Sequence, residues 1–149
     1  MTKPLLVWFN GELMSSAGAA SVDVNQSCLL DRANSFGDGV FETLLVQNGK
    51  LVLLDRHLQR LSQGLHRLSI PCARDQLGHD LQLLEPFIRE GDNFILKIVV
   101  SRGSTVFGYS SDQVSVNRLL LLQPYTAKRI NALRLMVCET RLSLSLIHI

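Results

Sequence analysis

Short apolar runs separated by glycine-containing turns occupy most of the chain. Asn10-Gly11 stands between the runs Leu5 to Phe9 and Glu12 to Met14. An Asn-Gly pair is typical of a tight hairpin turn, because both central residues of a type I′ turn need a positive φ. A second pair, Asn48-Gly49, predicts the strongest hairpin of the chain. The strands expected beside this second pair are Val40 to Val46 and Leu51 to Leu54.

The apolar spacing becomes helical between residues 55 and 88. Leucines at positions 58, 61, 65 and 68 predict a helix with Asp55 as its N-cap. This helix should end near Ser69, because the residue before Pro71 is pushed toward extended geometry. A second helix is expected from Arg74, with apolar residues at positions 77, 81, 84 and 88. Pro86 should kink it or end it early.

Three further apolar runs predict strands at Phe94 to Val100, Val116 to Leu122 and Leu133 to Cys138. Pro124 should end the middle one, and Val22 to Leu30 leaves its element type open. The order is hairpins, two helices and then more strands. It predicts an α+β fold, a mainly antiparallel sheet with two helices on one side.

The stretch from Asp31 to Thr43 changes from a polar loop into a strand, with Asp38 between two glycines. One interpretation is a tight turn that leads into a strand, in which Asp38 accepts hydrogen bonds from nearby backbone amides. The other is a pocket wall that directs Phe41 and Thr43, from one face of the strand, toward a ligand. The spacing alone leaves both open.

Composition narrows the class of protein. Of 149 residues, 46% are hydrophobic and 19% charged, which is typical of one globular domain and not of disorder. A net charge of +2 argues against nucleic acid and anionic membrane as partners, and no apolar run reaches membrane-spanning length. The scattered residues Cys28, Cys72 and Cys138 indicate a reducing, cytoplasmic setting. The four histidines show no ligand spacing, so we expect no zinc site.

Five pieces of the sequence follow one another in a characteristic order and spacing. These pieces are Asp31-Arg32 with Ser35 to Thr43, Asn48-Gly49-Lys50, Leu54 to Leu61, Leu96 to Gly103, and Gly108-Tyr109-Ser110. Together they resemble the fold-type IV pyridoxal-phosphate enzymes, and most of all the bacterial aminodeoxychorismate lyases within that family. D-amino-acid and branched-chain aminotransferases share the same frame, and the resemblance covers the chain to about Ser143.

The resemblance implies an activity. Such a lyase splits 4-amino-4-deoxychorismate into 4-aminobenzoate and pyruvate, a step of folate biosynthesis. It uses pyridoxal 5′-phosphate (PLP) as an electron sink. The family's enzymes are homodimers of two-domain subunits, with the cofactor between the domains. Residues 1–125 would then be the small N-terminal domain, and residues 126–149 the start of a second domain.

The resemblance also implies site residues. Arg60 corresponds to the arginine that holds the cofactor phosphate, a task suited to a permanently charged bidentate fork. By periodicity alone it would be a solvated helix residue. The substrate pocket would be lined by four residues, Phe41, Thr43, Phe107 and Tyr109, although without the resemblance Phe41 would be interpreted first as a core residue. The closest lyases tend to carry an arginine at the position of Phe107, so Arg102 or a partner chain would have to supply that charge. Arg102 could instead be structural and bind loop carbonyls.

No catalytic residue is assigned within the chain. The family's lysine that binds the cofactor covalently follows the segment that Glu139 to Ser143 matches, so it is expected beyond position 149. The alternating tail Leu142 to Ile149 fits a chain that is cut short or that leaves its native frame. We therefore expect the 149 residues alone to be inactive. The alternatives are a fragment of a D-amino-acid or branched-chain aminotransferase and a non-catalytic, free-standing domain.

Overall fold

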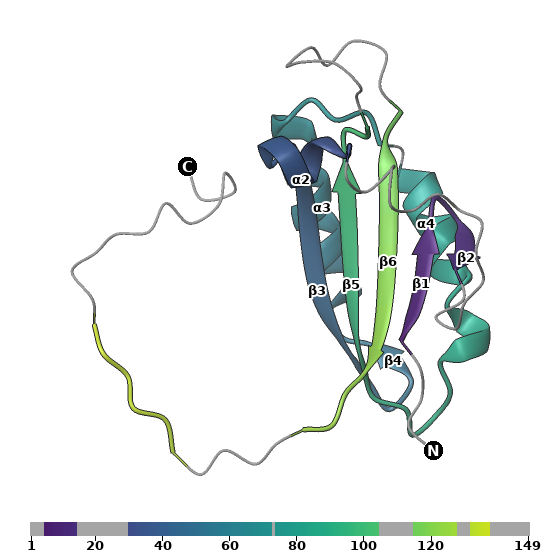
Figure 1. Cartoon of the computed structure of the whole chain (residues 1–149). Helices are drawn as coiled ribbons and strands as arrows, with labels where there is room; N and C mark the ends of the chain where they lie inside the picture. Colours follow the sequence, from purple (N-terminus) through teal and green to yellow (C-terminus); the bar gives the residue numbers. More distant parts are fainter. Residues whose placement is uncertain (1–4, 15–29, 73, 105–114, 128–131, 138–149) are drawn as a thin grey trace.

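The computed structural model describes residues 5–14, 30–72, 74–104, 115–127 and 132–137. Within these residues the structure has one six-stranded antiparallel sheet in the order β2-β1-β6-β5-β3-β4, with three α-helices and a short 3-10 helix (Figure 1). The elements are β1 (Leu6–Phe9), β2 (Glu12–Met14), α2 (Arg32–Phe36), β3 (Gly39–Gln47), β4 (Lys50–Leu51), α3 (Leu54–Arg67), α4 (Arg74–Gln82), η1 (Glu85–Phe87), β5 (Phe94–Ser101) and β6 (Asn117–Pro124).

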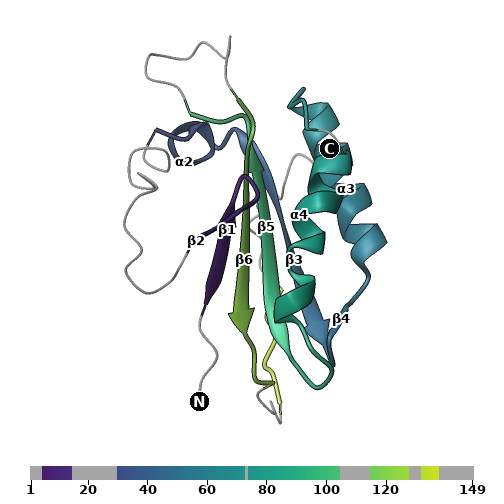
Figure 2. The same ribbon diagram turned by 90° about the vertical axis from the view of Figure 1, so that its right-hand side faces the viewer.

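Helices α3 and α4 cover the same face of the sheet, and α2 lies at one end on the other side (Figure 2). The predicted α+β fold with two helices on one side is therefore confirmed. Every second residue of the central strands points into the helix-covered core, as the period of a strand requires. The buried core includes Leu44 and Val46 of β3, Leu96 and Ile98 of β5, and Leu61 of α3. The intervening residues form the opposite, open face.

Both Asn-Gly turns are confirmed, because Asn10, Gly11, Asn48 and Gly49 all have positive φ. The return strand after the second turn is shorter than predicted. Strand β4 pairs only two residues with β3, because the chain reverses through Leu53 in the left-handed region. Leu53, and not Asp55, is therefore the N-cap of α3. Asp55 already lies in the first helical turn, where a carboxylate is favoured by the helix dipole.

The other helix boundaries agree with the sequence. Helix α3 ends at Arg67, and α4 starts at Arg74 as predicted. It ends at Gln82, and Pro86 lies in the separate turn η1, which confirms the early end. The expected polar loop before β3 contains the short helix α2. The Asp31 side chain caps this helix by accepting from the backbone amide of Ala33 at 2.8 Å.

The predicted strand Leu133 to Cys138 is wrong over its described part. Residues 132–137 form no strand, and the side chain of Leu135 is 92% exposed. A β-rich segment needs a neighbouring strand to pair with, and the described part of the chain offers none at this point. Cys138, most of Val22 to Leu30 and the tail Leu142 to Ile149 lie outside the described residues. Among the helices that are described, none has the length and apolar character to cross a membrane.

Candidate functional site

A cavity of about 550 Å³ opens on the face of the sheet that α3 and α4 leave uncovered. Its floor is apolar, and polar groups stand at both ends. Strand alternation explains most of the lining, because odd-numbered residues of β3, β5 and β6 point to this face. Val40, at the start of β3, is the exception. The apolar lining includes Phe9, Val40, Phe41, Val99 and Leu119, and the polar lining includes Asp31, Asn34, Lys97, Ser101 and Asn117.

Phe41 and Lys97 mark one end of the cavity. Phe41 is 63% exposed, so it is not a core residue. It pairs with Val99 across the sheet, whereas Lys97 pairs with Thr43. The Nζ atom of Lys97 nevertheless lies 5.1 Å from the centre of the Phe41 ring, a cation–π contact. The ammonium therefore leans along the strand toward the cavity. Lys97 is the one cation in the described cavity lining.

Asp31 organises the opposite end. Its Oδ2 atom accepts hydrogen bonds from Ser101 Oγ and from Asn117 Nδ2, both at 2.7 Å. The Asn117 amide also donates to Ser104 Oγ at 3.3 Å. These bonds join α2, β5 and β6 at their ends. One end of the cavity thus carries a carboxylate held by neutral hydrogen-bond donors. The other end carries a cation, and apolar side chains lie between the two.

Arg60 lies on the other face of the sheet, in an ion pair with Glu42. Glu42 stands between Phe41 and Thr43 in β3, so its side chain points to the helix side, where it is 1% exposed. Arg60 donates through Nε to Glu42 Oε1 at 2.5 Å and through Nη2 to Oε2. The ring nitrogen Nδ1 of His57 lies 2.8 Å from the same Oε2. Glu42 thus fixes the fork of Arg60 in one orientation.

The geometry of Arg60 fits a phosphate group. A guanidinium carries five N–H donors, and the bidentate contact with Glu42 uses one from each of two nitrogens. Three donors remain, on a side chain that is 49% exposed. The described residues place no second hydrogen-bond partner on Arg60. Phosphate is the anion that such a pre-oriented fork binds well. Arg60 thus has unused donors and a fixed orientation, and its role toward a phosphate stays a prediction.

The free edge of β3 brings the two faces together. Strand β4 pairs with Val46 and Gln47, and the Val52 amide donates to the Leu45 carbonyl, so among the described residues β3 forms the edge of the sheet from Gly39 to Leu44 (Figure 1). Arg60 approaches this edge from the helix side. Phe41 and the exposed Thr43 approach it from the open side, although Thr43 is not part of the cavity lining. One ligand at the edge could then contact both an anion-binding arginine and the apolar cavity.

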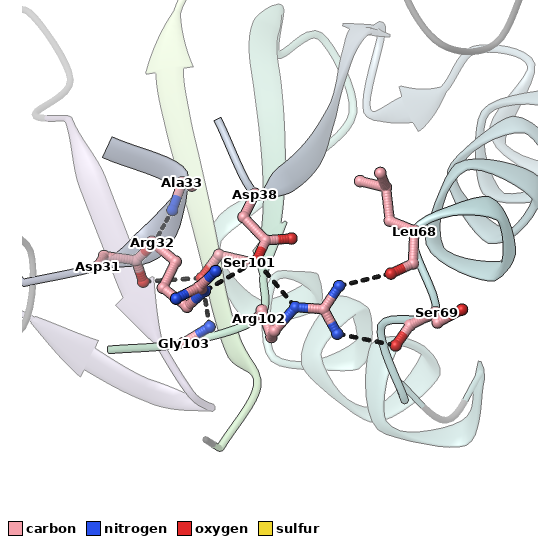
Figure 3. A network of polar contacts seen from close by, with 9 residues as sticks. All are labelled: Asp31, Arg32, Ala33, Asp38, Leu68, Ser69, Ser101, Arg102 and Gly103. Atoms are coloured by element: carbon pink, nitrogen blue, oxygen red, sulfur yellow. Dashed lines mark hydrogen bonds and ion pairs between the residues drawn. The ribbon is translucent and has the colours of Figure 1, made fainter. Parts of the chain in front are cut away.

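The alternative in which Arg102 replaces the charge missing at Phe107 is wrong, because Arg102 does not supply a charge to the cavity. It donates to the backbone carbonyls of Ser69 and Leu68 at 2.9 and 2.5 Å, as the structural interpretation predicted (Figure 3). Its Nε bonds Asp38 at 2.8 Å. The expectation that the Asp38 side chain binds backbone amides is also wrong, because its described partners are the guanidinium groups of Arg102 and Arg32.

Two predicted pocket residues, Phe107 and Tyr109, lie outside the described residues, so their placement stays a prediction. Lys97, in contrast, had no assigned role. A single lysine inside the apolar run Phe94 to Val100, in phase with Val99, is a signal that could have found it. In the described ranges, no group of three histidine, cysteine, aspartate or glutamate side chains could hold a metal ion.

Acid should weaken the fold through Glu42 and Asp38. Burial alone would raise the pKa of Glu42, but hydrogen bonds from Arg60 and His57 outweigh it and hold that pKa below 4.5. The pKa of Asp38 is likewise below 3.8, because bonds from Arg102 and Arg32 outweigh burial. A lowered pKa stabilises the fold above the ordinary value, and this contribution is lost as the pH falls through the lowered value.

We therefore expect the free energy of unfolding to be flat near neutral pH and to fall by about 1.5–3 kcal/mol between pH 5 and pH 3, the range for hydrogen bonds to charged groups. Urea unfolding at several pH values measures this. Glu42→Gln should flatten the decline. Asp55→Asn, on the first turn of α3, is the control and should leave most of it in place. An equally steep decline in Glu42→Gln would contradict the assignment to Glu42.

Comparisons with known proteins identify the family. Residues 39–145 match the model of the family described as amino-transferase class IV. Over 76 residues, 49% of this chain and 26% of the relative, the chain is 51% identical to a bifunctional aminodeoxychorismate lyase/D-amino acid transaminase from Mycobacterium tuberculosis. Among solved structures, it is similar to 4-amino-4-deoxychorismate lyase from Pseudomonas aeruginosa, with a TM-score of 0.65 and 34% identity over 83% of this chain and 42% of that one.

A second similar structure is a hypothetical aminotransferase from Mycobacterium tuberculosis in a PLP-bound form, with a TM-score of 0.62 and 25% identity over 83% of this chain and 41% of that one. Members of the family thus bind PLP. The chain spans less than half the length of each of these relatives. Its sheet and helices match the N-terminal domain of fold-type IV enzymes. The family model covers well over half of the sequence, and the chain therefore belongs to the class IV aminotransferase family of PLP enzymes.

Proposed function

We propose that this chain is the N-terminal part of a PLP-dependent 4-amino-4-deoxychorismate lyase, which forms 4-aminobenzoate and pyruvate. The observation that carries the proposal is Lys97 above an apolar cavity, beside the Phe41 ring. An anionic ring substrate needs apolar walls for its ring and a cation for a carboxylate. The similarity to the lyase from Pseudomonas aeruginosa supports the same assignment.

Each residue then has a task. Arg60, oriented by Glu42, holds the phosphate of PLP at the free edge of β3. Phe41 and Thr43 form the wall on the open side of that edge. Lys97 binds a substrate carboxylate, the charge that Phe107 cannot provide. When bound, PLP supplies an electron sink for the bond cleavage. The cavity walls orient the substrate and keep water from its ring.

None of the residues named above is proposed to bind PLP covalently. Of the lysines that the structure describes, Lys97 is engaged with Phe41 at the cavity, and Lys50 lies exposed on the short strand β4. We place the covalent lysine in a second domain, outside these 149 residues, and we include a homodimeric assembly of the complete enzyme in the proposal. The activity is thus proposed for the complete polypeptide and not for this chain alone.

The proposal predicts a difference between the chain and its extended form. The 149-residue protein with PLP and 4-amino-4-deoxychorismate should release no 4-aminobenzoate above the buffer rate. A polypeptide extended through the lysine-bearing domain should release 4-aminobenzoate at a rate at least about 10⁶-fold above the uncatalysed rate, which is the low end of the enhancements that enzymes reach. Fluorescence of 4-aminobenzoate measures both. Release by the short chain, or an inert extended chain that binds PLP, would contradict the proposal.

An aminotransferase that acts on D-amino acids or branched-chain amino acids is the second candidate. It is supported by the 51% identity to an enzyme whose name includes both lyase and D-amino acid transaminase activity. Phe107 also favours it, because a neutral residue replaces the arginine expected in a lyase. The extended polypeptide distinguishes the two candidates when it is given D-alanine or leucine with 2-oxoglutarate. Formation of glutamate without any 4-aminobenzoate release would select the aminotransferase.

A further inference from the structure

Asp38 joins two arginines through a single oxygen atom. Its Oδ2 accepts from Arg32 Nε and from Arg102 Nε, each at 2.8 Å (Figure 3). The side chains of Arg32, Asp38 and Arg102 are only 8%, 15% and 16% exposed. Little water therefore screens the three charges, so the contacts are strong and directional. Asp38 is thus the centre of an arginine–aspartate–arginine cluster.

The cluster connects parts of the chain that are distant in sequence. Arg32 belongs to α2, Asp38 directly precedes β3, and Arg102 directly follows β5. The backbone is tied as well, because the Arg102 amide donates to the Asp38 carbonyl at 3.1 Å and the Asp38 amide donates to the Arg32 carbonyl at 3.2 Å. Side-chain and backbone bonds thus fix the same residues twice, which leaves little freedom at the start of β3.

Arg102 extends the cluster to the end of α3. Its two terminal nitrogens donate to the carbonyls of Leu68, the C-cap of α3, and of Ser69. These carbonyls have no partner within the helix, and the negative end of the helix dipole favours a cation there. Figure 3 shows the guanidinium of Arg102 lying between Asp38 and this helix end. The last turn of α3 is therefore held against the start of β3.

The two sides of the cluster carry the two halves of the proposed ligand site. Helix α3 carries Arg60, eight residues before Leu68, which corresponds to about 12 Å along a helix axis. The cavity wall continues directly from Asp38 through Gly39 and Val40 to Phe41. Any shift of α3 against β3 would change the position of the phosphate-binding arginine relative to the cavity. The Glu42–Arg60 pair connects the middle of α3 to β3, and the cluster is a second polar connection, at the end of α3, that opposes such a shift.

We propose that Asp38 is a positioning residue, which holds Arg60 and the Phe41 wall in register so that one ligand can engage both. This inference rests on the proposed PLP site. It assigns Asp38 and Arg102 no contact with the ligand. When two binding sites are held at the correct spacing, a ligand that joins both groups gains affinity over either group alone. Asp38 therefore determines how much affinity a ligand gains from binding Arg60 and the Phe41 wall together. It does not determine the affinity of a ligand that binds only one of them.

The test measures this gain directly in the 149-residue chain. The ligands are inorganic phosphate, pyridoxine, and pyridoxine 5′-phosphate, which cannot react with lysine because it lacks the aldehyde. In the wild type, we expect pyridoxine 5′-phosphate to bind at least about 10-fold tighter than either half. In Asp38→Asn this advantage should fall below about 3-fold, while the affinities for the two halves change less than about 2-fold. Arg102→Lys, which keeps the charge but not the fork, should act in the same way.

Asp80→Asn is the matched control. Asp80 is another buried carboxylate paired with an arginine, since Arg118 Nε lies 2.6 Å from its Oδ2. It connects α4 with β6, and its side-chain partner among the described residues is Arg118, which lies outside the cavity lining. Asp80→Asn should lower the melting temperature as Asp38→Asn does. It should still bind pyridoxine 5′-phosphate more tightly than phosphate or pyridoxine. A role in stability alone would make both variants behave alike, which would overturn the inference.

Other outcomes separate the inference from the function on which it rests. If pyridoxine 5′-phosphate binds the wild type no tighter than phosphate, or if the advantage survives in both Asp38→Asn and Arg102→Lys, the positioning role is wrong. If Arg60→Ala changes the affinity for neither phosphate nor pyridoxine 5′-phosphate, the proposed cofactor site itself is wrong. Should Asp38→Asn fail to fold, Arg102→Lys gives the same comparison.

Discussion

Alanine in place of Gly103 is expected to destabilise the protein by about 3 kcal/mol or more, the upper range for a single strained residue with an added clash. Gly103 has a φ of +101°, and a Cβ atom there would lie 1.8 Å from the carbonyl oxygen of Ser115. The backbone would have to move, because the obstructing atom is a main-chain oxygen. The glycine is thus required both for its backbone angle and for a close approach of two segments.

The damage should extend to the cavity. The Gly103 carbonyl accepts from the Arg32 amide at 2.9 Å, and its own amide donates to Ser101 Oγ at 3.2 Å. A displaced Gly103 therefore disturbs α2 and the Asp31 end of the cavity together. Urea unfolding of purified protein measures the loss of stability. Gly78→Ala is the control, because this position in α4 has open space around it. It should stabilise the helix by about 0.5–1 kcal/mol. Equal stability of both variants would contradict the prediction.

Local features of the sequence predicted the parts of the fold that depend on few neighbours. The Asn-Gly turns follow from backbone angles that these residues tolerate, so both hairpins were found. Helix α2 was missed because it depends on the Asp31 cap and on the Gly103 carbonyl 71 positions away from Arg32 in the chain. The strand expected at Leu133 to Cys138 was wrong for the opposite reason. Its composition suits a strand, but pairing depends on a neighbour that no local pattern contains.

The site divides in a similar way. Arg60 was assigned through the resemblance, and the structure places its half-exposed fork beside Glu42. The Glu42 partnership could not be predicted, because it joins β3 to α3 across 18 positions. Arg102 was correctly interpreted as structural, but the carbonyls that it binds are those of Leu68 and Ser69 at the end of α3, and not those of its own glycine-containing loop. Its connection to Asp38 required the register of β3 with β5, which only the three-dimensional structure provides.

Methionine in place of Lys97 is expected to lower kcat/KM of the complete lyase for 4-amino-4-deoxychorismate by about 10- to 100-fold. This corresponds to about 1.5–3 kcal/mol, the usual contribution of a hydrogen bond to a charged group. Methionine keeps the length and apolar contact of the side chain with the Phe41 ring, so the cavity floor should remain. What is lost is the one cation in the described lining of the cavity. The stability should change little, because Lys97 is exposed.

The same change should be visible without catalysis. Binding of 4-aminobenzoate to the 149-residue chain, followed by ligand-observed NMR, should weaken by at least about 10-fold in Lys97→Met and recover in part in Lys97→Arg. Lys50→Met is the control, because Lys50 is an exposed lysine on β4 outside the cavity lining. If both lysine variants bind equally, the effect is one of net charge. If Lys97→Met binds as the wild type does, the carboxylate of the substrate must be held by residues outside this cavity, and the lyase assignment loses the observation on which it rests.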